Sequence, residues 1–120
     1  MKPIHLKEDE IADLVTIEEA IDVLEDAFLE QSSGGATSQP RERLRTDRVI
    51  LHIMAGAIPG FFGYKAYTSG SGKIRFLFYL FDSSNTELLA VIEADALGQI
   101  RTGAATGLAT RLLAREDASV

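Results

Sequence analysis

Apolar positions repeat at helical spacing early in the chain, just after Thr16. An apolar side chain returns every three or four residues, which indicates an amphipathic helix. The repeat consists of Ile17, Ala20, Ile21, Leu24, Ala27 and Phe28. Thr16 and Glu19 form a capping-box pattern at its start, and Ser32–Gly35 predicts its end. Before this helix, Ile4–Leu6 predicts a short strand and Glu8–Val15 predicts one or two helical turns.

The middle of the chain has the alternation and the turn residues of a β-sheet. The expected strands are Val49–Met54, Phe61–Tyr67, Ile74–Phe81 and Leu88–Ala94. Pro59-Gly60 and Ser69–Gly72 predict turns, and Asp82–Glu87 predicts a hairpin connection. The segment from Gly35 to Pro40 predicts a polar loop. Ile74–Phe81 is apolar or aromatic on both of its faces, so we expect that strand to be covered on both sides.

A helix that contains several glycines is expected at the end of the chain, over Asp95–Asp117. Asp95 is placed to cap it. Gly98, Gly103 and Gly107 lie inside it, and each interior glycine costs a helix about 1 kcal/mol relative to alanine. Glycines at such positions indicate that another element approaches the backbone closely. For Gly103 and Gly107 we expect close packing on the sheet.

Together these elements predict an α+β fold with an N-terminal helix, a mostly antiparallel sheet and a C-terminal helix. The length of 120 residues fits one domain spanning residues 1–120. The net charge of −6 argues against nucleic acid and anionic membranes as partners, because both need basic surfaces. The acidic N-terminal segment is unlike a signal peptide, and no apolar run is long enough to span a bilayer, which favours a cytoplasmic protein.

Several residue types and short motifs exclude other chemistry. The chain has no cysteine, so disulfides and thiolate chemistry are excluded. Ser71-Gly72-Lys73 does not form a phosphate loop, because Tyr67 stands where that motif needs glycine and Ile74 where it needs Ser or Thr. His5 and His52 lack carboxylates at ligand spacing, so we expect no metal site and interpret His52 as a partly buried structural histidine.

A lysine stands among aromatic residues in an expected core strand. Lys65 shares a strand face with Phe61, Gly63 and Tyr67. Such a lysine must reach solvent along the sheet, pair with an anion, or line a pocket. The sequence leaves a lysine at the sheet edge and a lysine in a pocket as open alternatives.

Four arginines offer further positive charges for a site that includes this lysine. Arg41, Arg43 and Arg45 alternate along one strand face, where they form either a solvated edge strand or part of a pocket. Arg101 lies in the first turns of the last helix, where the helix dipole favours anions, so we interpret it as holding an anion. If these cations converge with Lys65, they form a site for a carboxylate, which guanidinium binds through two hydrogen bonds.

Seven short segments carry a resemblance to a known family. They are Gln39-Pro40-Arg41, His52-Ile53-Met54-Ala55, Gly63-Tyr64-Lys65, Leu80-Phe81-Asp82, Leu88-Leu89-Ala90, Arg101-Thr102-Gly103-Ala104-Ala105 and Leu113-Ala114-Arg115. Taken in order along nearly the whole chain, they resemble the ornithine cyclodeaminase/mu-crystallin family. The Arg-Thr-Gly-Ala-Ala block followed by Leu-Ala-Arg is the most specific of them.

The resemblance implies a substrate-binding and dimerisation domain that is followed, after residue 120, by a Rossmann domain for NAD or NADP. The implied activity is hydride transfer at the α-carbon of an amino acid or cyclic imine, with deamination or imine reduction. The alternative is a non-catalytic, crystallin-like module that binds a small ligand or only dimerises. By the same resemblance we expect a homodimer.

The resemblance also implies roles for individual residues. Lys65, Arg101 and one of Arg41 or Arg43 would bind the substrate carboxylate, and we prefer Arg43. Lys65 would also polarise the reacting group as the catalytic residue. Arg101 and Thr102 would approach the cofactor. In place of a longer family loop this chain has only Thr68–Lys73, which argues against ornithine itself as the substrate.

Overall fold

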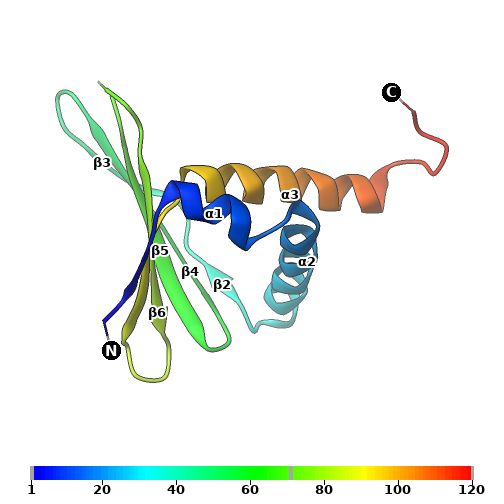
Figure 1. Ribbon diagram of the computed structural model, residues 1–120, viewed down its shortest axis with the longest axis horizontal. Helices are drawn as coiled ribbons and strands as arrows, with labels where there is room; N and C mark the ends of the chain where they lie inside the picture. Colours follow the sequence, from blue (N-terminus) through cyan, green and yellow to red (C-terminus); the bar gives the residue numbers. More distant parts are fainter. Residues whose placement is uncertain (1, 71, 120) are drawn as a thin grey trace.

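A computed structural model describes residues 2–70 and 72–119 of the protein (Figure 1). The elements in chain order are β1 (Ile4–Leu6), α1 (Glu8–Leu14), α2 (Ile17–Ser33), β2 (Thr37–Ser38), β3 (Glu42–Arg45), β4 (Ile50–Ile58), β5 (Phe61–Ser69), β6 (Phe76–Asp82), β7 (Leu88–Glu93) and α3 (Asp95–Leu113). Of the turn expected at Ser69–Gly72, Ser71 lies outside the described residues. No described helix is long and apolar enough to cross a membrane.

The strands form one mixed sheet in the order β1-β7-β6-β5-β4-β2, and β3 also pairs with β4. Every pair is antiparallel except β1 with β7. The predicted α+β class with a mostly antiparallel sheet is therefore confirmed. Strand β2 was not expected, because its two residues are held only by their pairing with β4.

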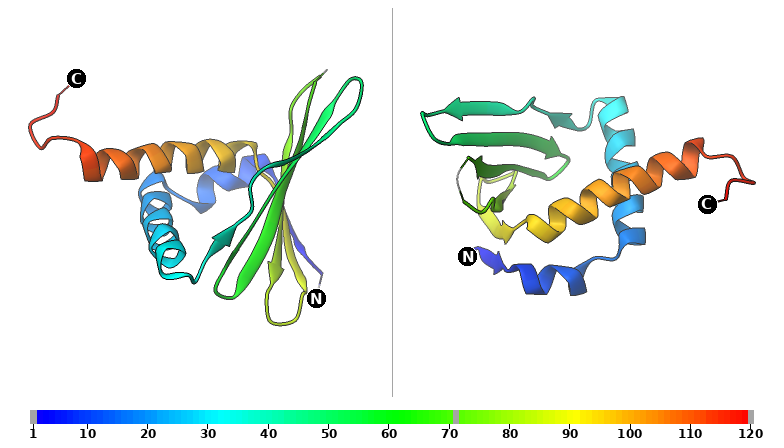
Figure 2. Two further views of the ribbon diagram at one scale, coloured as in Figure 1. Left: turned by 180° about the vertical axis from the view of Figure 1, so that it is seen from behind. Right: turned by 90° about the horizontal axis from the view of Figure 1, so that it is seen from above.

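The three helices lie on one side of the sheet (Figures 1 and 2). Phe78 and Leu80 of β6 line a cavity beneath α2, so the alternating side chains of Leu77, Tyr79 and Phe81 point to the opposite face. Leu77 is 38% exposed. The helices of the described chain cover a single face of this strand, so cover for its second face does not come from residues 2–70 and 72–119.

Helix α2 begins and ends as its sequence predicts. Thr16 Oγ1 accepts a hydrogen bond from the backbone N–H of Glu19 at 3.2 Å, and the Glu19 carboxylate accepts one from Thr16 N–H at 2.8 Å. Gly34 ends the helix in the left-handed conformation, with φ of 87°. Helix α2 then packs across α3, and this contact fixes the spacing of the helical layer.

Gly103 and Gly107 of α3 face α2, which corrects their expected packing on the sheet. A Cβ at Gly107 would lie 2.9 Å from Ile21 Cδ1, and one at Gly103 would lie 3.7 Å from Ile17 Cδ1. A Cβ at Gly98 would meet no atom within 4 Å. Close helix approach therefore explains Gly107, whereas packing does not explain Gly98.

The start of α3 is capped from the other end of the chain, and not by Asp95 as expected. Asp95 is the first helical residue, and its carboxylate accepts a hydrogen bond from Phe76 N–H at 2.8 Å. The Glu8 carboxylate instead accepts from Asp95 N–H at 2.7 Å and from Ala96 N–H at 2.8 Å. These bonds satisfy two of the free amides at the helix start and anchor α3 to α1. The helix ends at Leu113, before the expected Asp117.

Candidate functional site

Lys65 lies at the middle of β5, on the face that the helices cover. It pairs with Met54 on β4 and Phe78 on β6, and its side chain is half-buried. Its Nζ atom is 5.3 Å from the ring centroid of Phe76 and 5.8 Å from that of Tyr67. The pKa of Lys65 is lowered from its ordinary value, first by burial and then by the charges of Arg41 and Arg101. Arg41 also lies over the Tyr67 ring, with its Cζ atom 5.8 Å from the ring centroid, so Arg41 and Lys65 share this ring.

The register of β3 shows which arginine accompanies Lys65. Arg43 pairs with His52 and Arg45 with Ile50, so Arg41, Arg43 and Arg45 share the helix-covered face. Arg41 lies one step further along, and its Cζ atom is 5.8 Å from the ring centroid of Tyr67. Arg41 affects the pKa of Lys65, whereas Arg43 lies opposite His52. Arg41 is thus the strand arginine that lies over the same Tyr67 ring as Lys65, and the choice between Arg41 and Arg43 as the carboxylate ligand stays a prediction.

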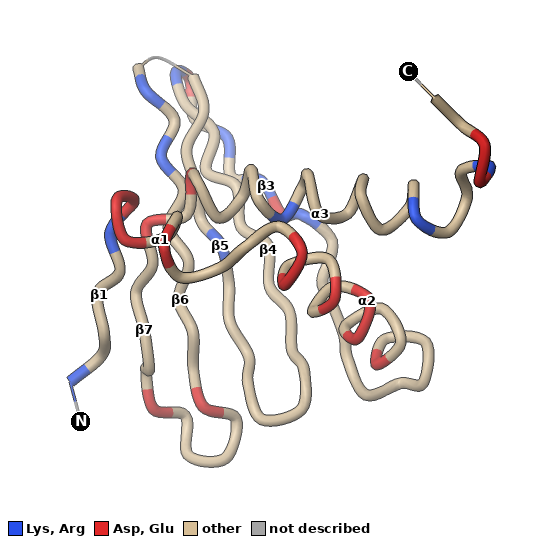
Figure 3. The backbone as a smooth tube through the Cα atoms, turned by 45° about the vertical axis from the view of Figure 1, so that its right-hand side comes forward, with Lys and Arg blue, Asp and Glu red and all other residues tan. Residues whose placement is uncertain are grey.

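Arg101 comes to the same region from the helical layer. It lies in the second turn of α3 and lines a cavity of about 530 Å³ between α2 and the sheet. Acidic residues gather on α1 and α2, and basic residues on the β3 side of the sheet, although the β6–β7 hairpin and β3 itself also carry acidic residues (Figure 3). Among residues 2–70 and 72–119, neither Arg41, Lys65 nor Arg101 forms an ion pair with a carboxylate. A cluster of cations without counter-charges is suited to bind an anion.

Thr102 faces a second cavity, which it shares with Lys65. This cavity has a volume of about 610 Å³. Its lining residues are Lys65, Ile74, Phe76, Asp95, Gly98, Gln99 and Thr102. The open space beside Gly98 faces no packed element, so this glycine leaves room at the cavity. The structure thus brings Thr102 and Lys65 together and places Arg101 at the neighbouring cavity.

His52 supports the site from within the sheet. It is only 7% exposed and stacks on Tyr67, with ring centroids 4.3 Å apart and an interplanar angle of 1°. Its Nε2 shares a 2.7 Å hydrogen bond with Ser69 Oγ. Burial and then the charges of Arg43, Arg41 and Arg45 lower its pKa, which favours the neutral ring. The interpretation of His52 as a buried structural histidine agrees with these contacts, which hold Tyr67 beneath Arg41 and Lys65.

No group of three or more metal-ligating His, Cys, Asp or Glu residues occurs in the described part of the chain. The site consists instead of cations, aromatic rings and small residues. This arrangement suits the binding of an organic carboxylate.

Comparison with known proteins identifies the family. The family model described as ornithine cyclodeaminase/mu-crystallin family matches residues 1–120. The chain belongs to the ornithine cyclodeaminase/mu-crystallin family. An alanine dehydrogenase from Archaeoglobus fulgidus is 30% identical to it over 127 residues, covering 100% of this chain and 39% of the relative.

Two solved structures of this family superpose closely on the chain. One is a probable ornithine cyclodeaminase from Bordetella pertussis Tohama I, with 36% identity and a TM-score of 0.90 over 95% of this chain and 37% of that chain. The other is an archaeal alanine dehydrogenase dimer with bound NAD, with 28% identity and a TM-score of 0.91 over 99% and 39%. The chain thus spans about two fifths of the length of these relatives.

Membership of the ornithine cyclodeaminase/mu-crystallin family confirms the resemblance, but sequence reasoning missed part of the site. Phe76 was not expected to contact Lys65, although it is the residue that pairs with Tyr67 across β5 and β6. The alternation of both strands was the available signal. Using it required the register of β6 against β5, which the sequence does not supply.

Proposed function

We propose that this chain is the substrate-binding part of an NAD(P)-dependent enzyme that acts on an α-amino acid or a cyclic imine. The reaction is hydride transfer at the α-carbon, with deamination or imine reduction. The observation that carries the proposal is the convergence of Arg41, Lys65 and Arg101 without a described carboxylate partner. Membership of a family that includes an alanine dehydrogenase supports it.

In this proposal the arginines hold the substrate carboxylate and Lys65 faces the reacting atoms. Arg41 and Arg101 approach from opposite layers, so they can grip one carboxylate and fix the α-carbon in place. Imine reduction needs a hydride at carbon and a proton at nitrogen. The ammonium of Lys65 gives up its proton more readily than an ordinary lysine, because its pKa is lowered, and this suits delivery of that proton from Nζ.

The cofactor in this proposal is NAD or NADP, and its reduced nicotinamide supplies the hydride. The residues here fit only the reactive end of such a cofactor. Thr102, Gln99 and Gly98 give a hydroxyl, an amide and open space beside Lys65. The described sheet offers no glycine-rich βαβ unit for the diphosphate, since its one parallel pair is β1 with β7. In this proposal Arg101 and Thr102 lie on the nicotinamide side, and the rest of the cofactor binds to a Rossmann domain that follows residue 120 in the full-length protein.

The test is the binding of small carboxylates to the protein, measured by calorimetry with pyruvate and L-alanine as probes. Arg101→Gln and Lys65→Met should each weaken binding by about 10- to 100-fold, since charge-assisted hydrogen bonds contribute about 1.5–3 kcal/mol. Arg111→Gln is the matched control, because Arg111 lies further along α3 and pairs with Asp22 and Glu25 at 3.3 Å. Equal binding by all three variants and the parent protein would contradict the proposed site.

The two candidate strand arginines are separated by the same assay. Arg41→Gln should weaken carboxylate binding as strongly as Arg101→Gln does, because the Arg41 guanidinium and the Lys65 ammonium lie over the same Tyr67 ring. Arg43→Gln should have a smaller effect, since Arg43 lies opposite His52. The reverse order would restore Arg43 as the pocket arginine.

We also propose that the protein is a homodimer that joins through the open face of the sheet. On that face Phe62 stacks on Phe81 at 5.1 Å and Tyr64 on Tyr79 at 4.8 Å, and no described helix covers them. Such an apolar face on a single-layered sheet favours a partner. An archaeal relative with 28% identity forms a dimer, which supports the proposal.

Sedimentation measures this assembly directly. Tyr79→Lys places a charge at the centre of the open face and should shift the protein from dimer to monomer. A parent protein that is monomeric at 100 μM would contradict the proposal.

A further inference from the structure

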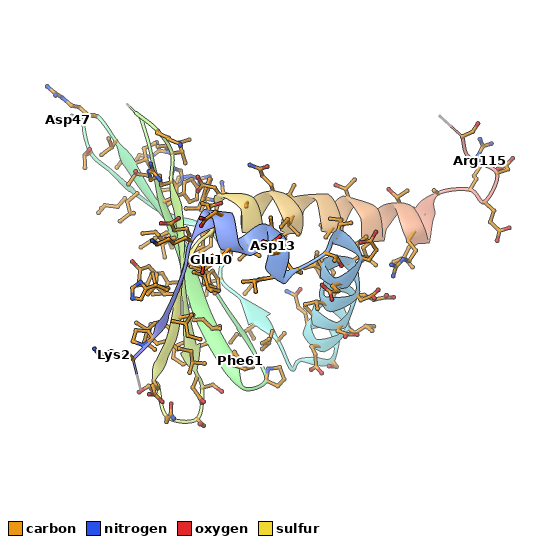
Figure 4. The ribbon with its side chains drawn as sticks, in the orientation of Figure 1. Lys2, Glu10, Asp13, Asp47, Phe61 and Arg115 are labelled. Carbon is orange, nitrogen blue, oxygen red and sulfur yellow. The ribbon has the colours of Figure 1, made fainter. Side chains whose placement is uncertain are left out.

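The cavity between α2 and the sheet has a wall made of large apolar side chains. These are Leu24 and Phe28 from α2, Ile58 from β4, Phe61 from β5, and Phe78 and Leu80 from β6. Figure 4 labels Phe61, at the start of β5 and on the side of the sheet where α2 lies. The volume of about 530 Å³ is within the usual range for small-molecule pockets.

Two glycines on neighbouring strands make the floor of this cavity. Gly56 of β4 pairs with Gly63 of β5, and both line the cavity. A Cβ at Gly63 would meet the Tyr79 carbonyl and would lie 2.9 Å from Phe78 Cζ, so the Phe78 ring rests against this glycine. A Cβ at Gly56 would meet only the Thr37 carbonyl, at 3.4 Å. Gly56 therefore keeps open a space that a side chain would fill.

The charges of the two cavities differ. Arg101 is the only charged residue among the described residues that line the apolar cavity, and no carboxylate lines it. The cavity beside it, which Lys65 and Thr102 line, contains Asp95 and Gln99. Arg101 lines the first cavity and acts on Lys65 in the second, so it stands between an apolar and a polar compartment.

We propose that the cavity between α2 and the sheet receives the side chain of the substrate, and that the substrate is an amino or imino acid with an uncharged, branched or aromatic side chain. This inference rests on the proposed function, in which Arg101 holds the carboxylate. A diamino acid would bring a terminal ammonium into this cavity, where no described carboxylate would compensate for its lost hydration. A methyl side chain would leave most of the space empty.

The affinity for a series of amino acids tests this directly. L-leucine and L-phenylalanine should bind at least tenfold more tightly than L-alanine and L-ornithine, because each buried methylene contributes about fourfold in affinity. Calorimetry with the four amino acids gives the order. A preference for L-alanine or L-ornithine would overturn the inference.

A charge on the cavity wall should reverse the preference. Phe28 is 46% exposed, so Phe28→Glu should fold, and it adds the missing carboxylate. This variant should bind L-ornithine at least tenfold more tightly than the parent protein does, and L-leucine more weakly. Leu29→Glu is the matched control, since Leu29 is the next residue on α2, is 62% exposed and does not line the cavity. The same change in both variants would overturn the inference.

Filling the floor gives a second, independent variant. Gly56→Val should lower the affinity for L-leucine at least tenfold and leave that for L-alanine within about twofold. If carboxylates bind and Arg101→Gln abolishes this, but L-leucine has no advantage, then the side-chain assignment fails and the proposed function stands. If no carboxylate binds to the protein, the proposed function itself fails.

Discussion

Replacing Glu8 with alanine should destabilise the whole domain, because this side chain caps a helix that begins 87 residues later. Its two carboxylate oxygens accept hydrogen bonds from Asp95 N–H at 2.7 Å and Ala96 N–H at 2.8 Å. Loss of an N-terminal cap costs about 0.5–2 kcal/mol, and loss of a negative charge at a helix start costs about 0.3–1 kcal/mol. These bonds are partly buried, so water replaces them poorly, and we expect a loss of about 2 kcal/mol.

Urea and thermal denaturation followed by circular dichroism measure this loss. For a domain of this size 1 kcal/mol corresponds to about 4 °C in Tm, so Glu8→Ala should lower Tm by about 8 °C. Glu8→Gln keeps one acceptor oxygen without the charge, so its Tm should lie between that of Glu8→Ala and that of the parent protein. Asp9→Ala is the matched control, because Asp9 is an exposed acid in the same first turn of α1 and bonds to no described residue of α3.

Equal stability of Glu8→Ala and Asp9→Ala would refute this reasoning. It would mean that only the charge of the first turn of α1 matters and that the contact with α3 contributes nothing. If the reasoning holds, Glu8→Ala should also weaken carboxylate binding, because Arg101 lies less than two turns after the capped amides. The capping contact would then connect the N-terminal segment of the chain to the geometry of the site.

Four further predictions concern Lys65 and the helices. Folding lowers the pKa of Lys65 below its ordinary value of 10.5, so the unfolded chain binds the proton more tightly. The free energy of unfolding, measured in urea, should therefore rise with pH between the lowered pKa and 10.5. Lys65→Met should remove this rise and should be more stable than the parent protein at pH 7. Gly98→Ala should stabilise α3 by about 1 kcal/mol in thermal unfolding because its Cβ meets open space. Gly107→Ala should bring no such gain, because its Cβ would lie 2.9 Å from Ile21 Cδ1. Relative to an Ile21→Val protein, which lacks that atom, the same substitution should stabilise α3 by about 1 kcal/mol. Thr16→Ala should cost about 1 kcal/mol in urea unfolding and leave carboxylate affinity unchanged.

Local chemistry made parts of the fold predictable. Helix α2 was expected because its cap, its apolar spacing and its terminal glycine all act within a few residues. Strand β4 was expected to end at Met54, because Ala55, Gly56 and Ala57 have little strand preference of their own. In the structure the strand continues to Ile58. Their pairing with β5 supplies the missing stabilisation. The cap of α3 was assigned to Asp95 because Asp95 is adjacent to the helix in sequence. The actual cap, Glu8, is distant in sequence and meets the helix only in the folded chain.

The apolar character of β6 shows a different limit of sequence reasoning. A strand with apolar side chains on both faces is expected to be covered on both faces. The pattern does not identify the element or the partner that covers each face. Helices cover Phe78 and Leu80, whereas no described element covers Tyr79 and Phe81. A second copy of the chain would satisfy the same pattern.

The site itself depends on the register of β3 against β4, which composition and alternation do not determine. Alternation correctly placed Arg41, Arg43 and Arg45 on one face, and it also placed Lys65 with Tyr67. Which arginine meets Lys65 depends on how β3 is shifted against β4, because a slip of two residues keeps the face and changes the neighbour. The pairing of Arg43 with His52 fixes that shift and leaves Arg41 beside the Lys65 row. The residues of an ion site built across strands are therefore specified by the strand register. They can be predicted only when the turns and edges that set this register are known.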